Sequence, residues 1–94
     1  MSFVVLPSFE VEEANLDAFL AAARADAAQS LANEAGCLQF DVFVDRAAHP
    51  TRVMFFEVYA DRAAFDAHQT RTRATDWWAA TAAIRRDFRI WHEE

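Results

Sequence analysis

Two apolar stretches in the middle of the chain constrain its fold most strongly. Leu38–Val44 and Val53–Tyr59 are rich in β-branched and aromatic residues, and the segment between them contains an Asp and a Pro, which are typical turn residues. Asp61 follows and can cap a short helix that carries Phe65 and, three residues later, His68. The pattern predicts two sheet strands and a sharp turn into a helix that delivers a histidine.

The flanking segments supply the other elements of a single domain spanning residues 1–94. We expect strands at Phe3–Val11 and Asp87–Trp91, and helices at Asn15–Asn33, Asp61–His68 (with a break near Thr70–Thr72) and Ala74–Ile84. The order is β-α-β-β-α-β, which is the ferredoxin-like pattern of an α+β fold with an antiparallel sheet.

Three local features refine this prediction. Asn15 or Glu13 can cap the first helix, and Gly36, the only glycine, suits the left-handed turn that often ends a helix. Pro7 cannot donate a hydrogen bond to a strand ladder, so we expect a bulge in the first strand.

The alternation along the third strand predicts a partner. Apolar residues occupy both faces of this strand, whereas a sheet with helices on one side and water on the other should alternate between apolar and polar. In the third strand, one predicted face carries Val53, Phe55, Glu57 and Tyr59, and the opposite face carries Met54, Phe56 and Val58. In the second strand, one predicted face carries Leu38, Phe40, Val42 and Val44, and the opposite face carries Gln39, Asp41, Phe43 and Asp45. We expect the second face to be covered by the same sheet of another copy, in a homodimer.

Composition excludes several classes of function. The net charge of −6 argues against nucleic acid and anionic membranes as partners, and the absence of lysine excludes lysine-based chemistry. One cysteine, Cys37, allows no intrachain disulfide and fits a reducing compartment, and no signal peptide or membrane span is recognisable. One glycine builds no phosphate loop, and the three histidines have no metal-ligand spacing. A cytoplasmic protein without a bound metal is the expectation.

The central motifs resemble a known family. Gly36-Cys-Leu-x-Phe-Asp-Val, followed by Phe56-Glu57-Val-Tyr59-x-Asp61-x-x-Ala-Phe65-x-x-His68, is similar to the antibiotic biosynthesis monooxygenase (ABM) domain. The resemblance implies a dimeric α+β barrel, in which two ferredoxin-like sheets pack face to face. Members include cofactor-independent monooxygenases of aromatic polyketides and quinols, an isomerase of a phosphorylated autoinducer, and haem-degrading enzymes, so the fold alone does not decide the function.

His68 is the leading candidate catalytic residue. It shares a helix face with Phe65, which places it at the rim of a pocket between the sheet and the helices. An imidazole there can take a proton from a phenol near neutral pH, and His68 also matches the family's recurrent histidine. A structural histidine bonded to the backbone is the alternative. His49 and His92 are expected to be exposed.

Other residues are predicted to complete the site. Trp77 matches an aromatic position of the family and can stack on a flat substrate, although it can equally fill the core. Tyr59 is the candidate donor to a developing oxyanion, and Glu57 shares its strand face; an ion pair of Glu57 with Arg52 or another arginine is the commoner outcome. The remaining candidates for substrate binding are Phe55, Phe65 and Arg73.

At two places the chain differs from the family pattern, and these differences disfavour some of the family's mechanisms and cofactors. Many members have Thr-Pro-His-Phe where this chain has Arg71-Thr72-Arg73-Ala74, so a second histidine is missing. Arg71 and Arg73 can bind an anion, or they can be solvated. The haem-degrading branch has its iron-ligating histidine near Trp77 and Trp78, so a haem cofactor is not expected.

Three functions follow from these residues. The first is a cofactor-independent monooxygenase that acts with O2 on an electron-rich aromatic, either a quinol or a polyketide anthrone, with His68 as the base. The second is an isomerase of a small phosphorylated hydroxy-carbonyl compound, with Arg71 or Arg73 on the phosphate. The third is a dimeric ligand-binding domain without catalysis.

Overall fold

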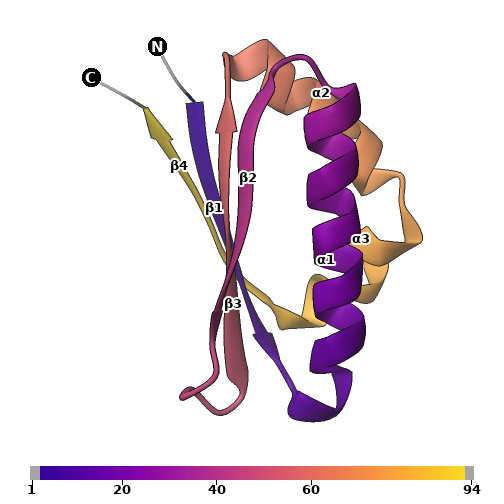
Figure 1. Ribbon diagram of the computed structural model, residues 1–94, viewed down its shortest axis with the longest axis vertical. Helices are drawn as coiled ribbons and strands as arrows, with labels where there is room; N and C mark the ends of the chain where they lie inside the picture. Colours follow the sequence, from indigo (N-terminus) through magenta and orange to yellow (C-terminus); the bar gives the residue numbers. More distant parts are fainter. Residues whose placement is uncertain (1–2, 93–94) are drawn as a thin grey trace.

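An antiparallel four-stranded sheet forms one layer, and helices cover one of its faces (Figure 1). The computed structural model describes residues 3–92, and the side chains of residues 87–89 and 92 lie outside the description. The strands are β1 (Phe3–Val11), β2 (Cys37–Asp45), β3 (Thr51–Tyr59) and β4 (Arg85–His92), in the spatial order β2-β3-β1-β4. The helices are α1 (Glu13–Asn33), α2 (Arg62–Arg73) and α3 (Asp76–Ala80), followed by the 3-10 turn η1 (Ala82–Ile84). The predicted ferredoxin-like α+β fold is confirmed.

An aromatic core fills the space between the sheet and the helices. The Phe9 ring lies 5.1 Å from Phe19 of α1 and 5.0 Å from Phe55 of β3, and Phe40 of β2 lies 5.4 Å from Phe55. Large flat side chains bury much apolar area per residue, which helps a chain of 94 residues to form a core. The alternation predicted for β3 is confirmed, because its core-facing residues are all buried: Val53, Phe55, Glu57 and Tyr59.

The helix boundaries differ from the prediction. α2 runs without a break to Arg73, and the chain turns at Ala74 and Thr75 instead of near Thr70–Thr72. The Thr70 hydroxyl donates to a carbonyl of its own helix, while Thr75 caps α3 by accepting from the Trp78 backbone N–H. Neither Asn15 nor Glu13 caps α1, because the N-cap position is Glu12, whose side chain makes no capping bond.

A bulge at the start of β2 overturns the predicted facing of Leu38. Cys37 pairs with Tyr59 and Gln39 pairs with Val58, so Leu38 is left without a partner in the register. The extra residue allows Cys37 and Phe40 both to face the core, and Leu38 is 56% exposed. Leu38 therefore does not share the core-facing side with Phe40.

Pro7 lies in a central strand, with β3 on one side of β1 and β4 on the other. The described β1–β3 pairs stop at Val5 and resume at Ser8, so the residue without an N–H lies in the gap. The register shift in the β1–β4 pairing falls between Ser8 and Phe9, one residue after the predicted position. The irregularity is thus real, and the ladder resumes directly after it.

Gly36 serves close packing and not a left-handed turn. Gly36 does not have a positive φ, so the prediction of a left-handed helix end is wrong. A Cβ at Gly36 would lie only 2.4 Å from the Cβ of Ala64 in the first turn of α2. Glycine is required here because the chain entering β2 touches α2.

Gly36→Ala is expected to destabilise the protein by about 1–3 kcal/mol, because two short side chains on rigid backbone cannot both occupy this space. Urea unfolding measures the loss. The double variant Gly36→Ala/Ala64→Gly removes the clash and should recover part of it, beyond the cost of a helical glycine. Strictly additive effects of the two substitutions would contradict the packing argument.

Candidate functional site

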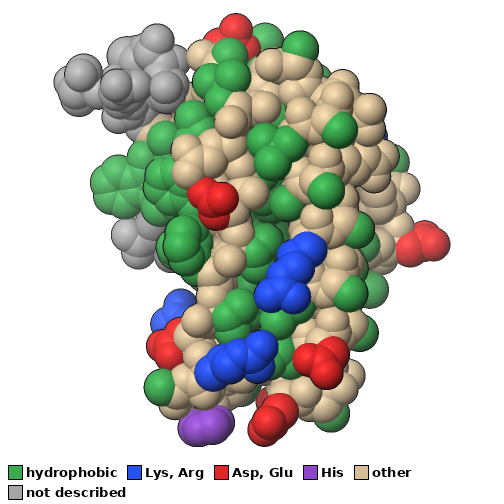
Figure 2. All heavy atoms as spheres, viewed as in Figure 1, with side chains coloured by type: hydrophobic (Ala, Val, Ile, Leu, Met, Phe, Trp, Pro, Cys, Tyr) green, Lys and Arg blue, Asp and Glu red, His purple; other side chains and the backbone are tan. Residues whose placement is uncertain are grey.

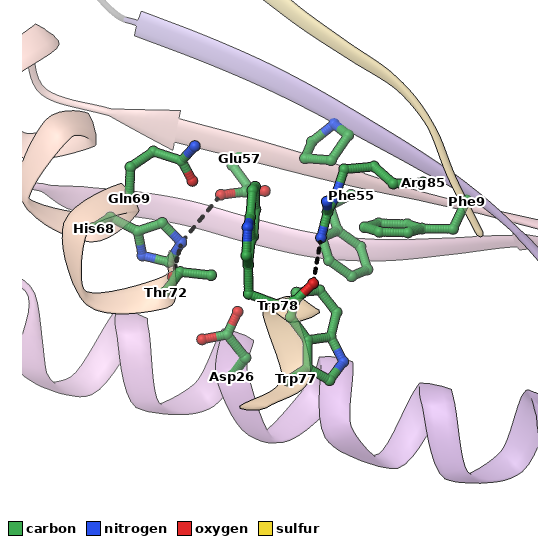
Figure 3. A pocket seen from close by; sticks show the side chains of 11 residues that line it. Phe9, Asp26, Phe55, Glu57, His68, Gln69, Thr72, Trp77, Trp78 and Arg85 are labelled. Carbon is green, nitrogen blue, oxygen red and sulfur yellow. Dashed lines mark hydrogen bonds and ion pairs between the residues drawn. The ribbon is translucent and has the colours of Figure 1, made fainter. Parts of the chain in front are cut away.

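A small cavity lies between the sheet and all three helices, and we call it the inner cavity (Figure 3). Its volume is about 20 Å³, which is room for one water molecule. Most of the wall is aromatic or aliphatic. Glu57, Gln69 and Thr72 lie beside His68 at one end, whereas Arg85 lies on the other side of Trp78. The lining residues are Pro7, Phe9, Asp26, Phe55, Glu57, His68, Gln69, Thr72, Trp77, Trp78 and Arg85.

A larger depression, the outer groove, adjoins the inner cavity. It has a volume of about 480 Å³ and runs between α1 and the α2–α3 segment. Asp26, Thr72 and Trp77 line both spaces, so these three side chains form the partition between them. α3 contains no buried residue, and Trp77 on this short helix is half-buried, with its ring against those of Phe9, Phe19 and Phe55.

His68 is held at both ring nitrogens. Asp61 caps α2 by accepting from the Ala64 N–H at 2.9 Å, and His68 follows on the face that packs against the sheet. His68 is only 4% exposed. Its Nδ1 lies 3.0 Å and 3.2 Å from the two carboxylate oxygens of Glu34, and its Nε2 lies 3.2 Å from the Thr72 hydroxyl. Both ring nitrogens thus have side-chain partners and not the backbone partner of the alternative prediction. These contacts fix the ring with Nε2 toward the cavity.

Glu57 and Tyr59 form a buried pair beside this nitrogen. The Tyr59 hydroxyl donates to Glu57 Oε1 at 2.6 Å, and the same oxygen lies 3.7 Å from His68 Nε2. Burial is the main cause that raises the pKa of Glu57 to about 8, and burial followed by the nearby Glu57 charge raises the pKa of Tyr59 well above its ordinary value. Burial also lowers the pKa of His68. At neutral pH the site therefore combines a neutral imidazole with a protonated carboxyl.

The structure brings four of the predicted site residues together at the inner cavity. These are His68, Glu57, Phe55 and Trp77. Tyr59 is fully buried behind Glu57, and Phe65 lies deeper in the core, with its ring 5.5 Å from that of Tyr59. Arg73 does not line this cavity; its guanidinium lies 5.5 Å from the Trp78 ring.

The charged residues and the cysteine predicted from the sequence differ in how well the structure matches the predictions. The predicted ion pair of Glu57 with an arginine is wrong, because Glu57 bonds to Tyr59 and faces His68 instead. His49 is exposed as predicted, whereas the side chain of His92 lies outside the described residues. Cys37 is buried, and burial raises its pKa, which fits a small core residue and not a nucleophile. Among the described residues, no group of acidic, histidine or cysteine side chains could hold a metal ion.

Sequence reasoning missed Glu34, Asp26 and Arg85. Glu34 lies 34 residues before His68, and nothing in the local pattern marks it. Arg85 lies 3.7 Å above the Trp78 ring and donates to the Trp78 carbonyl, and both residues form part of the cavity wall (Figure 3). The signal for Asp26 was an acidic residue on the otherwise alanine-rich inner half of α1, beside the buried Ala23 and Ala27.

Glu57→Gln should change how stability depends on pH. The folded state keeps a proton on Glu57 up to about pH 8, whereas the unfolded chain releases it near the ordinary value of 4.5. Stability contributed by this group is therefore present at low pH and lost as pH rises through this window. Relative to the wild type, Glu57→Gln should become more stable by at least about 1 kcal/mol between pH 5 and pH 8.5.

Urea unfolding of both proteins at the two pH values provides the measurement. His68 contributes to the pH dependence of stability in the opposite direction, because its lowered pKa makes stability fall at acid pH. Both proteins contain His68, so most of this contribution cancels in the difference between Glu57→Gln and wild type. Glu13→Gln, at an exposed carboxylate in the first turn of α1, is the matched control. A stability difference between Glu57→Gln and wild type that stays constant with pH would mean that Glu57 is ionised in the folded protein.

The fold and the cavity define an α+β protein with a buried histidine beside a small cavity between the sheet and the helices. The family model described as antibiotic biosynthesis monooxygenase matches residues 2–85, and the chain belongs to this ABM family. No match was found among curated proteins. None of the helices in the described part of the chain is long and apolar enough to cross a membrane.

Solved structures agree with the family. A candidate antibiotic biosynthesis monooxygenase from Nitrosomonas europaea is 25% identical, with 98% of this chain and 89% of that chain covered at a TM-score of 0.75. Protein SO0527 from Shewanella oneidensis is 28% identical, with 96% and 86% covered at 0.70. A further antibiotic biosynthesis monooxygenase is 26% identical, with 97% and 94% covered at 0.69. Family and neighbours together indicate monooxygenase-like chemistry.

Proposed function

We propose that the protein is a cofactor-independent monooxygenase that acts with O2 on an electron-rich aromatic compound, a quinol or an anthrone. One observation carries the proposal: the Nε2 atom of a buried, neutral His68 faces a cavity walled by aromatic rings. Such a site can orient a flat ring and remove its proton away from water. Membership of the ABM family supports this class of chemistry.

The proposed reaction begins with proton transfer to His68. The resulting substrate anion passes one electron to O2, and the substrate radical and superoxide combine into a peroxide anion, which takes the proton back from His68. Loss of water then leaves a carbonyl, so that a CH2 group and O2 become C=O and H2O. The protein supplies the base, the orientation and a dry environment, while the substrate supplies the electrons.

Glu57 is the group proposed to stabilise the developing oxyanion. Tyr59 was the sequence-based candidate, but its hydroxyl is already donated to Glu57. A carboxyl whose pKa is raised to about 8 retains its proton at neutral pH and can donate it in a hydrogen bond. Tyr59 then acts through Glu57, by holding one of its oxygens in place.

Substrate binding requires the partition to move. A cavity of about 20 Å³ cannot admit an aromatic ring, whereas the adjoining outer groove of about 480 Å³ can. Trp77 separates the two spaces and lies on α3, which contains no buried residue. We propose that the substrate enters from the outer groove, displaces the Trp77 indole, and stacks against it.

The two arginines that the isomerase hypothesis assigns to a substrate phosphate are not in the inner cavity. Arg71 forms an ion pair with Glu34, and Arg73 lies outside the inner cavity against Trp78. Neither guanidinium lines the inner cavity, where a substrate phosphate would lie near His68. Arg85 does line the cavity, but its guanidinium already donates to the Trp78 carbonyl and the Thr81 hydroxyl.

Oxygen uptake over a panel of hydroquinones and anthrones tests the proposal. Wild type should exceed the spontaneous rate, and His68→Gln, which retains a polar side chain opposite Glu34, should lose about 10²- to 10⁴-fold of the enzymatic rate. His49→Ala, at an exposed histidine, should keep full activity. Circular dichroism checks that each variant is folded. Equal turnover by wild type and His68→Gln would refute the base assignment; ligand binding without any uptake would indicate a binding domain.

The open face of the sheet supports the proposal of a homodimer through sheet-to-sheet packing. Phe43 is 52% exposed, Met54 is its cross-strand partner, and Trp91 is 51% exposed beside Val4. Figure 2 shows hydrophobic side chains gathered on the strand side of the molecule, away from α1. Patches of this kind on a small protein mark interaction sites, and a second copy offers a complementary apolar surface.

Phe43→Glu should convert the proposed dimer into a monomer, because a charge would be buried without a partner at the interface. Sedimentation equilibrium at matched concentrations measures the mass. Leu31→Glu, at an exposed apolar residue of α1, is the matched control and should remain dimeric. A monomeric wild type at these concentrations would disprove the dimer.

A further inference from the structure

Glu34 contacts His68 from the side away from the inner cavity. It directly follows α1, and its backbone is fixed because its N–H donates to the Ser30 carbonyl at 2.9 Å and its carbonyl accepts from the Cys37 N–H at 3.0 Å. Glu34 is absent from the lining of the inner cavity but lines a separate surface groove with Gly36 and Arg71. The imidazole therefore stands between the cavity and this carboxylate.

The geometry distinguishes the two ring nitrogens. Both oxygens of Glu34 approach Nδ1, at 3.0 Å and 3.2 Å, and an ionised carboxylate can only accept a hydrogen bond. The Arg71 guanidinium bonds to the same carboxylate and supplies a permanent positive charge beside it. Nδ1 must then carry the hydrogen of the neutral ring, which leaves the lone pair on Nε2, the nitrogen near Thr72 and Glu57.

We propose that Glu34 is a positioning residue that selects the His68 tautomer with an unprotonated Nε2 and stabilises the imidazolium once Nε2 has taken a proton. The role in turnover rests on the proposed oxygenase function, while the choice of tautomer is a property of the free protein. Glu34 acts through His68 and does not touch the substrate. The Arg71–Glu34–His68 series thereby connects the cavity base to the protein surface.

Other charged and titratable groups also face the His68 ring and have to be separated from the effect of Glu34. Asp26 of α1 acts on it through space, Glu57 and Tyr59 face it from β3, and Arg71 of α2 acts through Glu34. Among the described side chains, Glu34 is the hydrogen-bond partner of Nδ1. A substitution confined to Glu34 therefore tests that nitrogen while the groups near Nε2 stay unchanged.

The first experiment is an NMR titration of the imidazole nitrogens in wild type and Glu34→Gln, without substrate. In wild type, His68 should show a protonated Nδ1 and an unprotonated Nε2. In Glu34→Gln, loss of the carboxylate should lower the measured pKa of His68 by at least about one unit, while Glu34→Asp should restore part of the shift. Glu13→Gln is the control for loss of one surface carboxylate and should match wild type.

The second experiment follows turnover against pH. Glu34→Gln should lose about 10- to 100-fold in kcat with KM little changed, and the acid limb of its pH profile should move to lower pH. An unchanged His68 pKa and tautomer in Glu34→Gln would overturn the proposal. If no substrate of the panel consumes oxygen with wild type, the proposed function fails, and the titration alone still decides the role of Glu34.

Discussion

The burial of the Glu57 carboxyl in an aromatic core is the constraint on which the site depends. Removing a carboxyl from water is costly, and none of the arginines in the described part of the chain forms an ion pair with Glu57 to offset that cost. The protein meets this cost by keeping the proton on Glu57, by the bond from Tyr59, and by placing the imidazole of His68 nearby. A titratable pair with opposite pKa shifts is the result, and such pairs are typical of acid–base sites.

The same constraint explains why the site lies where it does. Glu57 and Tyr59 alternate with outward-facing residues on a strand that has neighbours on both sides, so their side chains reach the core beneath the helices. Phe9 and Phe55 are fixed by the sheet, whereas Trp77 is carried by the short helix α3. The sheet thus holds Glu57 and two of the aromatic walls, whereas the helices hold His68, Asp26 and Trp77.

The alternation along β3 and the single histidine of α2 could be predicted because strand and helix periods place side chains by sequence distance alone. The facing of Leu38 and the role of Gly36 could not. A one-residue bulge leaves the hydrophobic pattern nearly unchanged, and the contact of Gly36 with Ala64 depends on how two elements approach each other. Glu34 is hidden for the same reason, since its distance from His68 is a product of the tertiary fold.

The two ring nitrogens of His68 have different surroundings. A histidine kept only for stability gains most when both nitrogens are matched by strong partners. Here Nδ1 has two carboxylate oxygens within 3.2 Å, while Nε2 has one hydroxyl at that distance and a carboxyl oxygen at 3.7 Å, too far for a hydrogen bond. The weaker arrangement lies on the cavity side. A ring fixed by a carboxylate at Nδ1, with a single hydroxyl at Nε2, supports the proposal that Nε2 is the atom that takes a proton from the substrate.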